Sequence, residues 1–299
     1  MSVAAIGYLR IGAQDQDAWM NFGTSVLGLM DAAREDSQGA RFLRMDDHPF
    51  RFMVEAGEDK LLAAGFEYRS QEEWQAVVDA LNSAGHSTEA GSAEEAARRC
   101  VKEFVSVQDP SGNSIELYWG RLLDYTPFVS PVAVKNFVTG DGDTGDMGFG
   151  HAVLPAPETA ATVSFYTDII GFGICDTLDI PMPESQVIFM HADNPRQHSL
   201  ALYNQPYPVG VVHLMVEVET LDEVGLAMDR AKAQGAHIVT SLGRHVNDNM
   251  CSFYVLAPNG MAVEYGYDGL LIDWDDFTPT HSTEGDLWGH EYNFPGVND

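Results

Sequence analysis

The chain contains an internal repeat, and this repeat constrains its fold more than any other feature of the sequence. The segment that begins at Ile6 has the same pattern as the one that begins at Phe149: an apolar strand, a polar turn, an amphipathic helix and a closing glycine. A second pair of segments begins at Ala63 and at His213, again with a strand that leads into an amphipathic helix closed by a glycine. The repeat predicts four similar modules arranged in two halves.

Each half ends in a pair of strands joined by a tight turn. The turn sequences are P-S-G within 109–118 and P-N-G within 257–266, and both favour a hairpin. We therefore expect an α+β protein with an N-terminal domain at residues 1–130 and a C-terminal domain at residues 131–299, each with two paired modules. The segment 126–146 contains G-D-G-D-T-G-D, which is typical of an exposed linker and lacks the ligand pattern of a calcium loop.

The composition argues against two classes of partner. The chain has 299 residues, of which 45% are hydrophobic, enough for a well-filled core. Its 45 acidic and 16 basic residues give a formal net charge of −29, which repels phosphate backbones and anionic lipid heads. The sequence has no apolar run long enough to cross a membrane and does not begin like a signal peptide. We expect a cytoplasmic protein that binds neither nucleic acid nor membranes.

The two halves carry different sets of residues at three equivalent positions of the repeat. The C-terminal half has two histidines and a glutamate on separate predicted strands: His151, His213 and Glu264. The N-terminal half has at the same places Tyr8, Ala63 and Glu116. Two imidazoles and one carboxylate are the ligand set of a mononuclear ferrous site with open positions. A cation would also remove the cost of burying Glu264 in the alternating segment A-V-E-Y-G, although Glu116 suggests that the fold keeps this glutamate without a complete site.

The sequence motifs around these positions resemble those of a known family. They are G-H-A-V at Gly150, V-H-L-M-V-E-V at Val212, G-R-H-V-N-D-N-M-C-S-F-Y at Gly243 and V-E-Y-G at Val263. Over essentially its whole length the chain resembles the type I extradiol ring-cleavage dioxygenases of the vicinal oxygen chelate superfamily, whose domains are pairs of βαβββ modules. The resemblance implies Fe(II) as the cofactor and a homo-oligomeric assembly. Mn(II) is an alternative because it accepts the same ligands.

The resemblance also assigns roles to residues around the metal. His198 matches a histidine that lies over the oxygen site and moves protons. His245 and Tyr254 match residues that hydrogen-bond the two oxygens of a bound catechol, and Asn247 and Asp248 match residues that support the site. In this group, His198, His245 and Tyr254 are the expected catalytic residues.

Other side chains near these motifs are less clearly assigned. Three apolar residues are candidates for the pocket around the aromatic ring and equally plausible as core: Val153, Ile174 and Phe189. Several relatives have a second histidine beside the one at the oxygen site, and this chain has Gln197 there, which leaves the local hydrogen bonding open. His48 and His290 lie in polar, loop-like sequence, and we expect no functional role for them.

The implied reaction is cleavage of an aromatic, bicyclic catechol beside its diol, with both atoms of O2 entering a yellow 2-hydroxy-6-oxo-dienoate. The partners of the chain would then be the catechol and O2. Two other functions stay open on the sequence. A glyoxalase-like isomerase commonly binds its metal with two glutamates and would not need His198, His245 or Tyr254. A non-catalytic binder of small molecules would need no metal at all.

Overall fold

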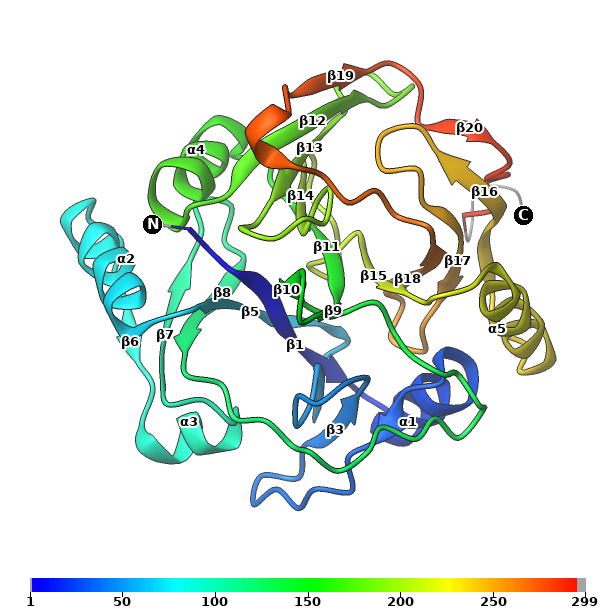
Figure 1. Ribbon diagram of the computed structural model, residues 1–299, viewed down its shortest axis with the longest axis horizontal. Helices are drawn as coiled ribbons and strands as arrows, with labels where there is room; N and C mark the ends of the chain where they lie inside the picture. Colours follow the sequence, from blue (N-terminus) through cyan, green and yellow to red (C-terminus); the bar gives the residue numbers. More distant parts are fainter. Residues whose placement is uncertain (1, 295–299) are drawn as a thin grey trace.

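The computed structural model describes residues 2–294 and contains two large β-sheets, one from each half of the chain (Figure 1). The eight-stranded sheet has the order β2 (Met30–Asp31), β3 (Arg41–Arg44), β4 (Phe52–Ala56), β1 (Ala5–Ala13), β5 (Lys60–Tyr68), β8 (Ser114–Trp119), β7 (Glu103–Gln108) and β6 (Glu89–Ala90). The ten-stranded sheet has the order β19 (Thr280–Ser282), β12 (Gly173–Asp179), β13 (Gln186–His191), β14 (Leu200–Tyr203), β11 (Gly150–Pro155), β15 (His213–Glu217), β18 (Ala262–Tyr267), β17 (Cys251–Leu256), β16 (Ile238–His245) and β20 (Asp286–Trp288).

The helices lie around the outside of the two sheets (Figure 1). They are α1 (Gln16–Phe22), α2 (Gln71–Ser83), α3 (Ala93–Arg98), α4 (Thr159–Ser164) and α5 (Leu221–Ala233). Two π-helical turns continue α1 and α4, namely η1 (Gly23–Leu27) and η2 (Phe165–Ile170), and a short 3-10 helix is η3 (Trp274–Asp276). Gly28 and Gly171 end the two π-helical turns with positive φ angles of 81° and 98°, as the closing glycines of the repeat predicted. No helix within residues 2–294 is long and apolar enough to span a membrane.

The two sheets share one topology, which confirms the predicted repeat and the α+β fold class. In each sheet the first strand of the half pairs in parallel with one neighbour and antiparallel with the other, as β1 does with β4 and β5 and β11 does with β14 and β15. The ten-stranded sheet differs by its two outer strands, β19 and β20, which come from the end of the chain. The hairpins at P-S-G and P-N-G form β7–β8 and β17–β18, as expected.

Strand alternation separates each sheet into a core face and an inner face. On β11, Ala152 and Leu154 belong to the large apolar core, whereas Val153 belongs to a smaller cluster on the opposite face. The register then aligns the repeats: Tyr8 pairs with Gly65, which pairs with Glu116, and His151 pairs with Met215, which pairs with Glu264. The sheet therefore carries the predicted site residues on its inner face because they alternate with core residues.

The two halves pack closely against each other. The large core cluster includes side chains from both sheets, and α5 packs against η1 while α2 packs against η2. The hydroxyl of Tyr68 donates to the carbonyl of Ile170 at 2.9 Å, and the hydroxyl of Tyr265 donates to the carbonyl of Leu27 at 3.2 Å. We keep the division into domains at 1–130 and 131–299 as a proposal, with an extensive apolar interface between them.

The G-D-G-D-T-G-D stretch of the segment 126–146 is largely exposed, as predicted, but the segment is more ordered than a plain linker. Its end forms a small hairpin from β9 (Gly140–Asp141) and β10 (Gly145–Asp146). The side chain of Asp146 is only 8% exposed and contacts Arg51, Arg121 and His48 of the N-terminal half. These partners neutralise the carboxylate and, although burial opposes the effect, hold the pKa of Asp146 well below its ordinary value.

Candidate metal centre

Three side chains on neighbouring strands converge on the inner face of the ten-stranded sheet. His151 lies on β11, His213 begins β15 and Glu264 lies on β18, and these three strands are consecutive in the sheet. The side chains of His151 and Glu264 are almost fully buried, and that of His213 is 18% exposed. The sequence predicted these residues together because they occupy equivalent places in the repeat, and the sheet order brings them side by side.

The distances between the three side chains fit a shared metal ion. The Nε2 atoms of His151 and His213 lie 3.1 Å apart, and Oε2 of Glu264 lies 3.1 Å from the first and 3.4 Å from the second. Ligands at right angles around a metal, with bonds of about 2.1 Å, are separated by about 3.0 Å. All three atoms can therefore coordinate one ion with only small shifts. The residues present fit a divalent metal of the kind that binds two imidazoles and a carboxylate.

The electrostatics of this group also suit a cation. Burial alone would raise the pKa of Glu264, but the contacts with His151, His213 and His245 outweigh it and hold that pKa well below its ordinary value. Burial lowers the pKa of His151 to about 4, so its imidazole is neutral at pH 7 and has a lone pair for a metal. An ionised carboxylate and a neutral imidazole are the protonation states that metal binding requires.

His198 lies beside the three converging residues, in the loop between β13 and β14. Its ring centroid is 4.1 Å from that of His151, and its Nδ1 lies 2.6 Å from Oε1 of Gln197. Burial and the neighbouring His151 lower the pKa of His198 well below its ordinary value. The sequence left the hydrogen bonding at Gln197 open, and in the structure its Oε1 accepts from His198. A hydrogen on Nδ1 leaves Nε2 of His198 as the acceptor nitrogen.

His245 and Tyr254 lie on the other side of Glu264. Nε2 of His245 is 2.9 Å from the hydroxyl of Tyr254 and 3.4 Å from Oε1 of Glu264. Burial alone would lower the pKa of His245, but contacts with Asp286 and Glu264 raise it well above its ordinary value. Burial raises the pKa of Tyr254 well above its ordinary value, so its hydroxyl keeps its proton. Both groups can donate hydrogen bonds toward an oxygen bound at this side of the site.

The two supporting residues after His245 have different surroundings. Asp248 is 4% exposed, its Oδ2 lies 3.8 Å from Nδ1 of His198, and burial raises its pKa to about 6. The side-chain nitrogen of Asn247 is buried and has no hydrogen-bond partner within residues 2–294. Buried donors nearly always find a partner, so this amide is available to a ligand.

The structure brings two of the three apolar pocket candidates together. Val153 and Phe189 belong to one small cluster on the inner face, and the Phe189 ring centroid lies 4.8 Å from that of His198. Ile174 instead packs against the large core. The reason is a register shift in β12 between Ile174 and Asp176, which places Cys175 in the inner cluster.

Three residues near the centre were not found from the sequence: Ser252, Asp286 and His290. The hydroxyl of Ser252 donates to Oε1 of Glu264 at 2.7 Å, and Asp286 contacts both His245 and His290. His290 lies in a loop, as expected, but its side chain is only 3% exposed. His48 likewise lies in a loop and is buried against Asp146 at 2.8 Å. Neither histidine is near a recognisable motif.

The N-terminal half has two arginines where the C-terminal half can hold a metal. Glu116 is 1% exposed and accepts hydrogen bonds from Tyr8 at 2.6 Å, from Arg10 at 2.7 Å, and from Nε and NH2 of Arg99 at 2.7 and 2.6 Å. These guanidinium groups neutralise the buried carboxylate. The two halves thus share a glutamate at this place of the repeat, and in the N-terminal half it is surrounded by ion pairs with arginines.

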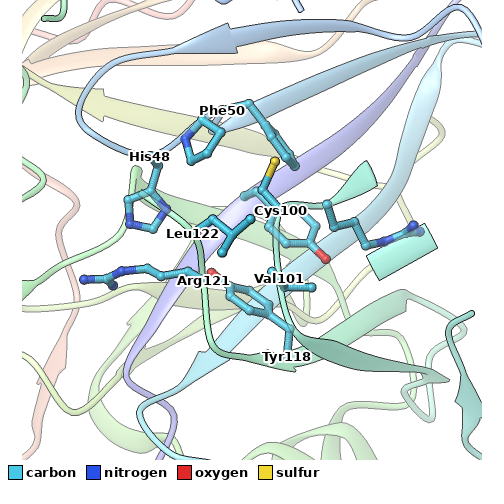
Figure 2. Close-up of a pocket in the computed structure, with 10 residues that line it drawn as sticks. His48, Phe50, Cys100, Val101, Tyr118, Arg121 and Leu122 are labelled. Atoms are coloured by element: carbon cyan, nitrogen blue, oxygen red, sulfur yellow. The ribbon is translucent and has the colours of Figure 1, made fainter. Parts of the chain in front are cut away.

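A small cavity in the N-terminal half adjoins this cluster. Figure 2 shows His48, Phe50, Cys100, Val101, Tyr118, Arg121 and Leu122 around it, and Tyr8, the counterpart of His151, also lines it. The cavity has a volume of about 10 Å³, the space of one water molecule. It is far too small for a catechol, and it contains none of the residues expected to act on one.

Comparison with known proteins assigns both halves of the chain to related families. Residues 148–265 match the model of the glyoxalase/bleomycin resistance protein/dioxygenase superfamily, and residues 6–57 match the model of the first domain of the dihydroxybiphenyl dioxygenase BphC. An iron-dependent extradiol dioxygenase of Rhodococcus jostii (strain RHA1) is 39% identical over 98% of this chain and 98% of the relative. A biphenyl-2,3-diol 1,2-dioxygenase of Metapseudomonas furukawaii is 36% identical over 97% of this chain and 94% of the relative.

A solved structure has the same fold over nearly the whole chain. The crystal structure of BphC, a halotolerant catechol dioxygenase, superimposes with a TM-score of 0.90 at 32% identity, and covers 98% of this chain and 96% of its own. The likeness therefore extends over both sheets and is not limited to the half that contains His151, His213 and Glu264.

Proposed function

This chain belongs to the iron-dependent extradiol dioxygenases, and from that premise we propose that it cleaves a bicyclic catechol at Fe(II) held by His151, His213 and Glu264. The ring opens beside the diol, and both atoms of O2 enter a 2-hydroxy-6-oxo-dienoate. Membership of this family sets aside the glyoxalase-like isomerase and the non-catalytic binder as alternatives.

The observation that carries the ligand assignment is the convergence of three ligand atoms. Two imidazole nitrogens and one carboxylate oxygen lie 3.1 to 3.4 Å from one another on the inner face of the sheet. Fe(II) held by these three groups supplies open coordination positions and an electron path between a singlet catechol and triplet O2. The charge of Glu264, together with that of a catechol bound as a monoanion, would balance the charge of the metal.

His198 is the residue placed to move a proton. Its imidazole is neutral at pH 7 because burial lowers its pKa, so it can take a proton when the substrate binds. The hydrogen bond between Nδ1 and Gln197 supports this role, since it leaves Nε2 free to accept. The same nitrogen can return the proton when the ring is opened.

His245 and Tyr254 are placed to hold the diol. Their contact at 2.9 Å fixes the two groups relative to each other, and both can donate to one oxygen of the catechol. Donation to one oxygen only favours an asymmetric monoanion and fixes the orientation of the ring. Asn247, whose buried amide nitrogen lacks a protein partner within residues 2–294, can add a further donor. Asp248 lies beside His198, 3.8 Å from its Nδ1, and adds a negative charge next to that ring.

The apolar cluster on the inner face supports a bicyclic substrate. Val153 and Phe189 pack there with Cys175, Val187 and Ala201, and partly buried side chains surround them: Leu178, Ile180, Tyr203, Val212, Trp274 and Phe277. Apolar contacts of this kind would favour a second ring over a polar substituent. Ile174 packs against the large core and lies outside this cluster.

An isotope experiment tests the proposed reaction. The full chain is loaded with Fe(II) without oxygen, given biphenyl-2,3-diol and then exposed to ¹⁸O2. We expect a yellow ring-opened product that contains two ¹⁸O atoms, and a higher kcat/KM for biphenyl-2,3-diol than for 3-methylcatechol. A product with one label or none would contradict the dioxygenase reaction, and a preference for the monocyclic catechol would contradict the bicyclic assignment.

Three further properties accompany this proposal. Mn(II) suits the same ligands as Fe(II), and metal analysis of the active protein distinguishes them. The homo-oligomer and the cytoplasmic location implied on the sequence stay predictions. Size-exclusion chromatography with light scattering tests the first, and fractionation of the source cells tests the second.

A further inference from the structure

The last strand of the ten-stranded sheet reaches the catalytic group from the end of the chain. β20 pairs with β16, and in this register Asp286 lies opposite His245. β20 extends the sheet beyond the pattern of the repeat, since β6 is the outermost strand at the matching edge of the eight-stranded sheet. The backbone pairing therefore places a carboxylate next to His245 that the N-terminal half does not supply.

A single oxygen of Asp286 contacts two histidines. Its Oδ1 lies 2.8 Å from Nδ1 of His245 and 2.6 Å from Nδ1 of His290. An ionised carboxylate only accepts hydrogen bonds, so these contacts put a hydrogen on Nδ1 of each ring. The carbonyl oxygen of Gly285, 3.3 Å from Nδ1 of His245, is a second and longer acceptor for the same hydrogen. The Nε2 atom of His245 then points the other way, toward Tyr254 at 2.9 Å and Glu264 at 3.4 Å.

The same contacts connect the end of the chain to the carboxylate of the metal centre. Nε2 of His290 lies 3.1 Å from the carbonyl oxygen of Ser252 and 3.3 Å from its hydroxyl. That hydroxyl donates to Oε1 of Glu264, the oxygen that faces away from His151. These contacts link Asp286 to His245 directly, and to Glu264 through His290 and Ser252.

We propose that Asp286 is a positioning residue for His245: by accepting the Nδ1 hydrogen, it fixes the ring so that Nε2 faces Tyr254 and the diol oxygen. The effect on turnover rests on the proposed function, whereas the effect on the ring of His245 does not. Partners of this kind fix the tautomer and the orientation of a functional imidazole, and their loss typically changes activity about tenfold to a hundredfold.

Two variants separate hydrogen bonding from packing. Asp286→Leu keeps the branched shape at a larger volume and has no acceptor, and Asp286→Asn keeps both the size and an acceptor oxygen. We expect the Leu variant to bind iron normally with a kcat lowered about tenfold to a hundredfold, and the Asn variant to recover to within about threefold of the wild type. Leu287→Ala is the matched control, since this neighbouring side chain is 60% exposed, and its kcat should not change.

A double variant shows whether Asp286 acts through His245. Asp286→Leu added to His245→Gln should slow turnover no further than His245→Gln alone, because the residue that Asp286 positions is already lost. Multiplying losses would overturn the proposal, as would a Leu variant with the kcat of the wild type. If Asp286→Leu does not fold, Asp286→Ala replaces it with the same expected and contrary results.

A measurement on the iron-free protein tests the role of Asp286 independently of the proposed dioxygenase activity. In ¹⁵N NMR of the iron-free full chain, with the signals of His245 assigned by their loss in His245→Gln, we expect a protonated Nδ1 in the wild type and in Asp286→Asn. In Asp286→Leu, where the longer contact with the Gly285 carbonyl is the acceptor that remains near Nδ1, we expect a mixture of tautomers. Identical His245 signals in all three proteins would overturn the proposal, whether or not the iron-loaded chain cleaves catechols.

Discussion

Replacing the buried Glu116 tests the inference that this glutamate stabilises the N-terminal half through ion pairs and takes no part in the metal centre. In the N-terminal half this side chain is the common acceptor for Arg10 and Arg99, and it is 1% exposed. Glu116→Gln keeps the size of the side chain and removes its charge. Arg10 still has Glu55 at 2.8 Å, but Arg99, 5% exposed, loses its counter-charge and keeps neutral partners, the carbonyl oxygen of Glu95 at 3.2 Å and the ring of Phe104 at 4.1 Å.

The magnitude follows from leaving a buried guanidinium without a counter-charge. Removing one partner of a buried ion pair typically costs about 3–5 kcal/mol of unfolding free energy. At about 3 °C of melting temperature per kcal/mol for a chain of this size, the expected loss is roughly 9–15 °C. Iron content and kcat of the folded variant should stay those of the wild type, because Glu116 lies in the half without the metal centre. Glu264→Gln, which changes the matching residue of the C-terminal half, should lose iron.

Calorimetry and metal analysis of the same preparations provide the assay. Glu58→Gln is the control: this glutamate pairs with Lys60 at 2.7 Å but is 80% exposed, so its loss should leave the melting temperature unchanged. A Glu116→Gln protein that melts within about 2 °C of the wild type would refute the reasoning. The same would hold for a variant that melts normally and loses its iron.

The pH dependence of stability has a defined sign at this residue. Burial alone would raise the pKa of Glu116, but Arg99 and Arg10 outweigh it and lower the pKa below its ordinary value of 4.5. A carboxyl group whose pKa is lower in the folded than in the unfolded chain stabilises the fold. This stabilisation is complete above the pKa of the unfolded chain and is lost as the pH falls through the pKa of the folded chain. The stability of the wild type should therefore fall below about pH 4.5 more steeply than that of Glu116→Gln, and equal slopes in acid denaturation curves would contradict this.

The remaining predictions concern the metal centre and the net charge. His151→Ala should lose both iron retention and ring cleavage, and an iron-loaded, active variant would remove His151 from the ligand set. His198→Phe should retain iron while kcat falls about a hundredfold or more, the scale of general acid–base catalysis, and an unchanged kcat would remove His198 from the reaction. Because a charge of −29 repels itself, added NaCl should raise the melting temperature, and a decrease from low to moderate salt would show that repulsion is not limiting.

The features that sequence reasoning predicted well depend on repetition. The internal repeat predicted the common order of the two sheets, because equivalent apolar patterns pair in equivalent ways. The same alignment placed His151, His213 and Glu264 at matching positions of the repeat, where the first half has Tyr8, Ala63 and Glu116. The strand register then brings these three side chains to one point on the inner face.

The features that sequence reasoning missed lie outside the repeat or depend on local irregularity. Asp286 and His290 come from the end of the chain, which has no equivalent in the first half and no regular apolar pattern. Ile174 was misplaced because a register shift in β12 changes which side chains face inward, and such a shift has no clear sequence signal. Asp146 appeared to be part of a linker, since its arginine partners are distant in sequence.

The most direct test of the central claim is a crystal structure of the full chain with Fe(II) and a catechol, prepared without oxygen. We predict one iron bound by Nε2 of His151, Nε2 of His213 and one carboxylate oxygen of Glu264, with both diol oxygens on the metal and one position left for O2. An iron that lacks any of these three protein ligands, or one whose coordination leaves no room for the diol and O2, would contradict it.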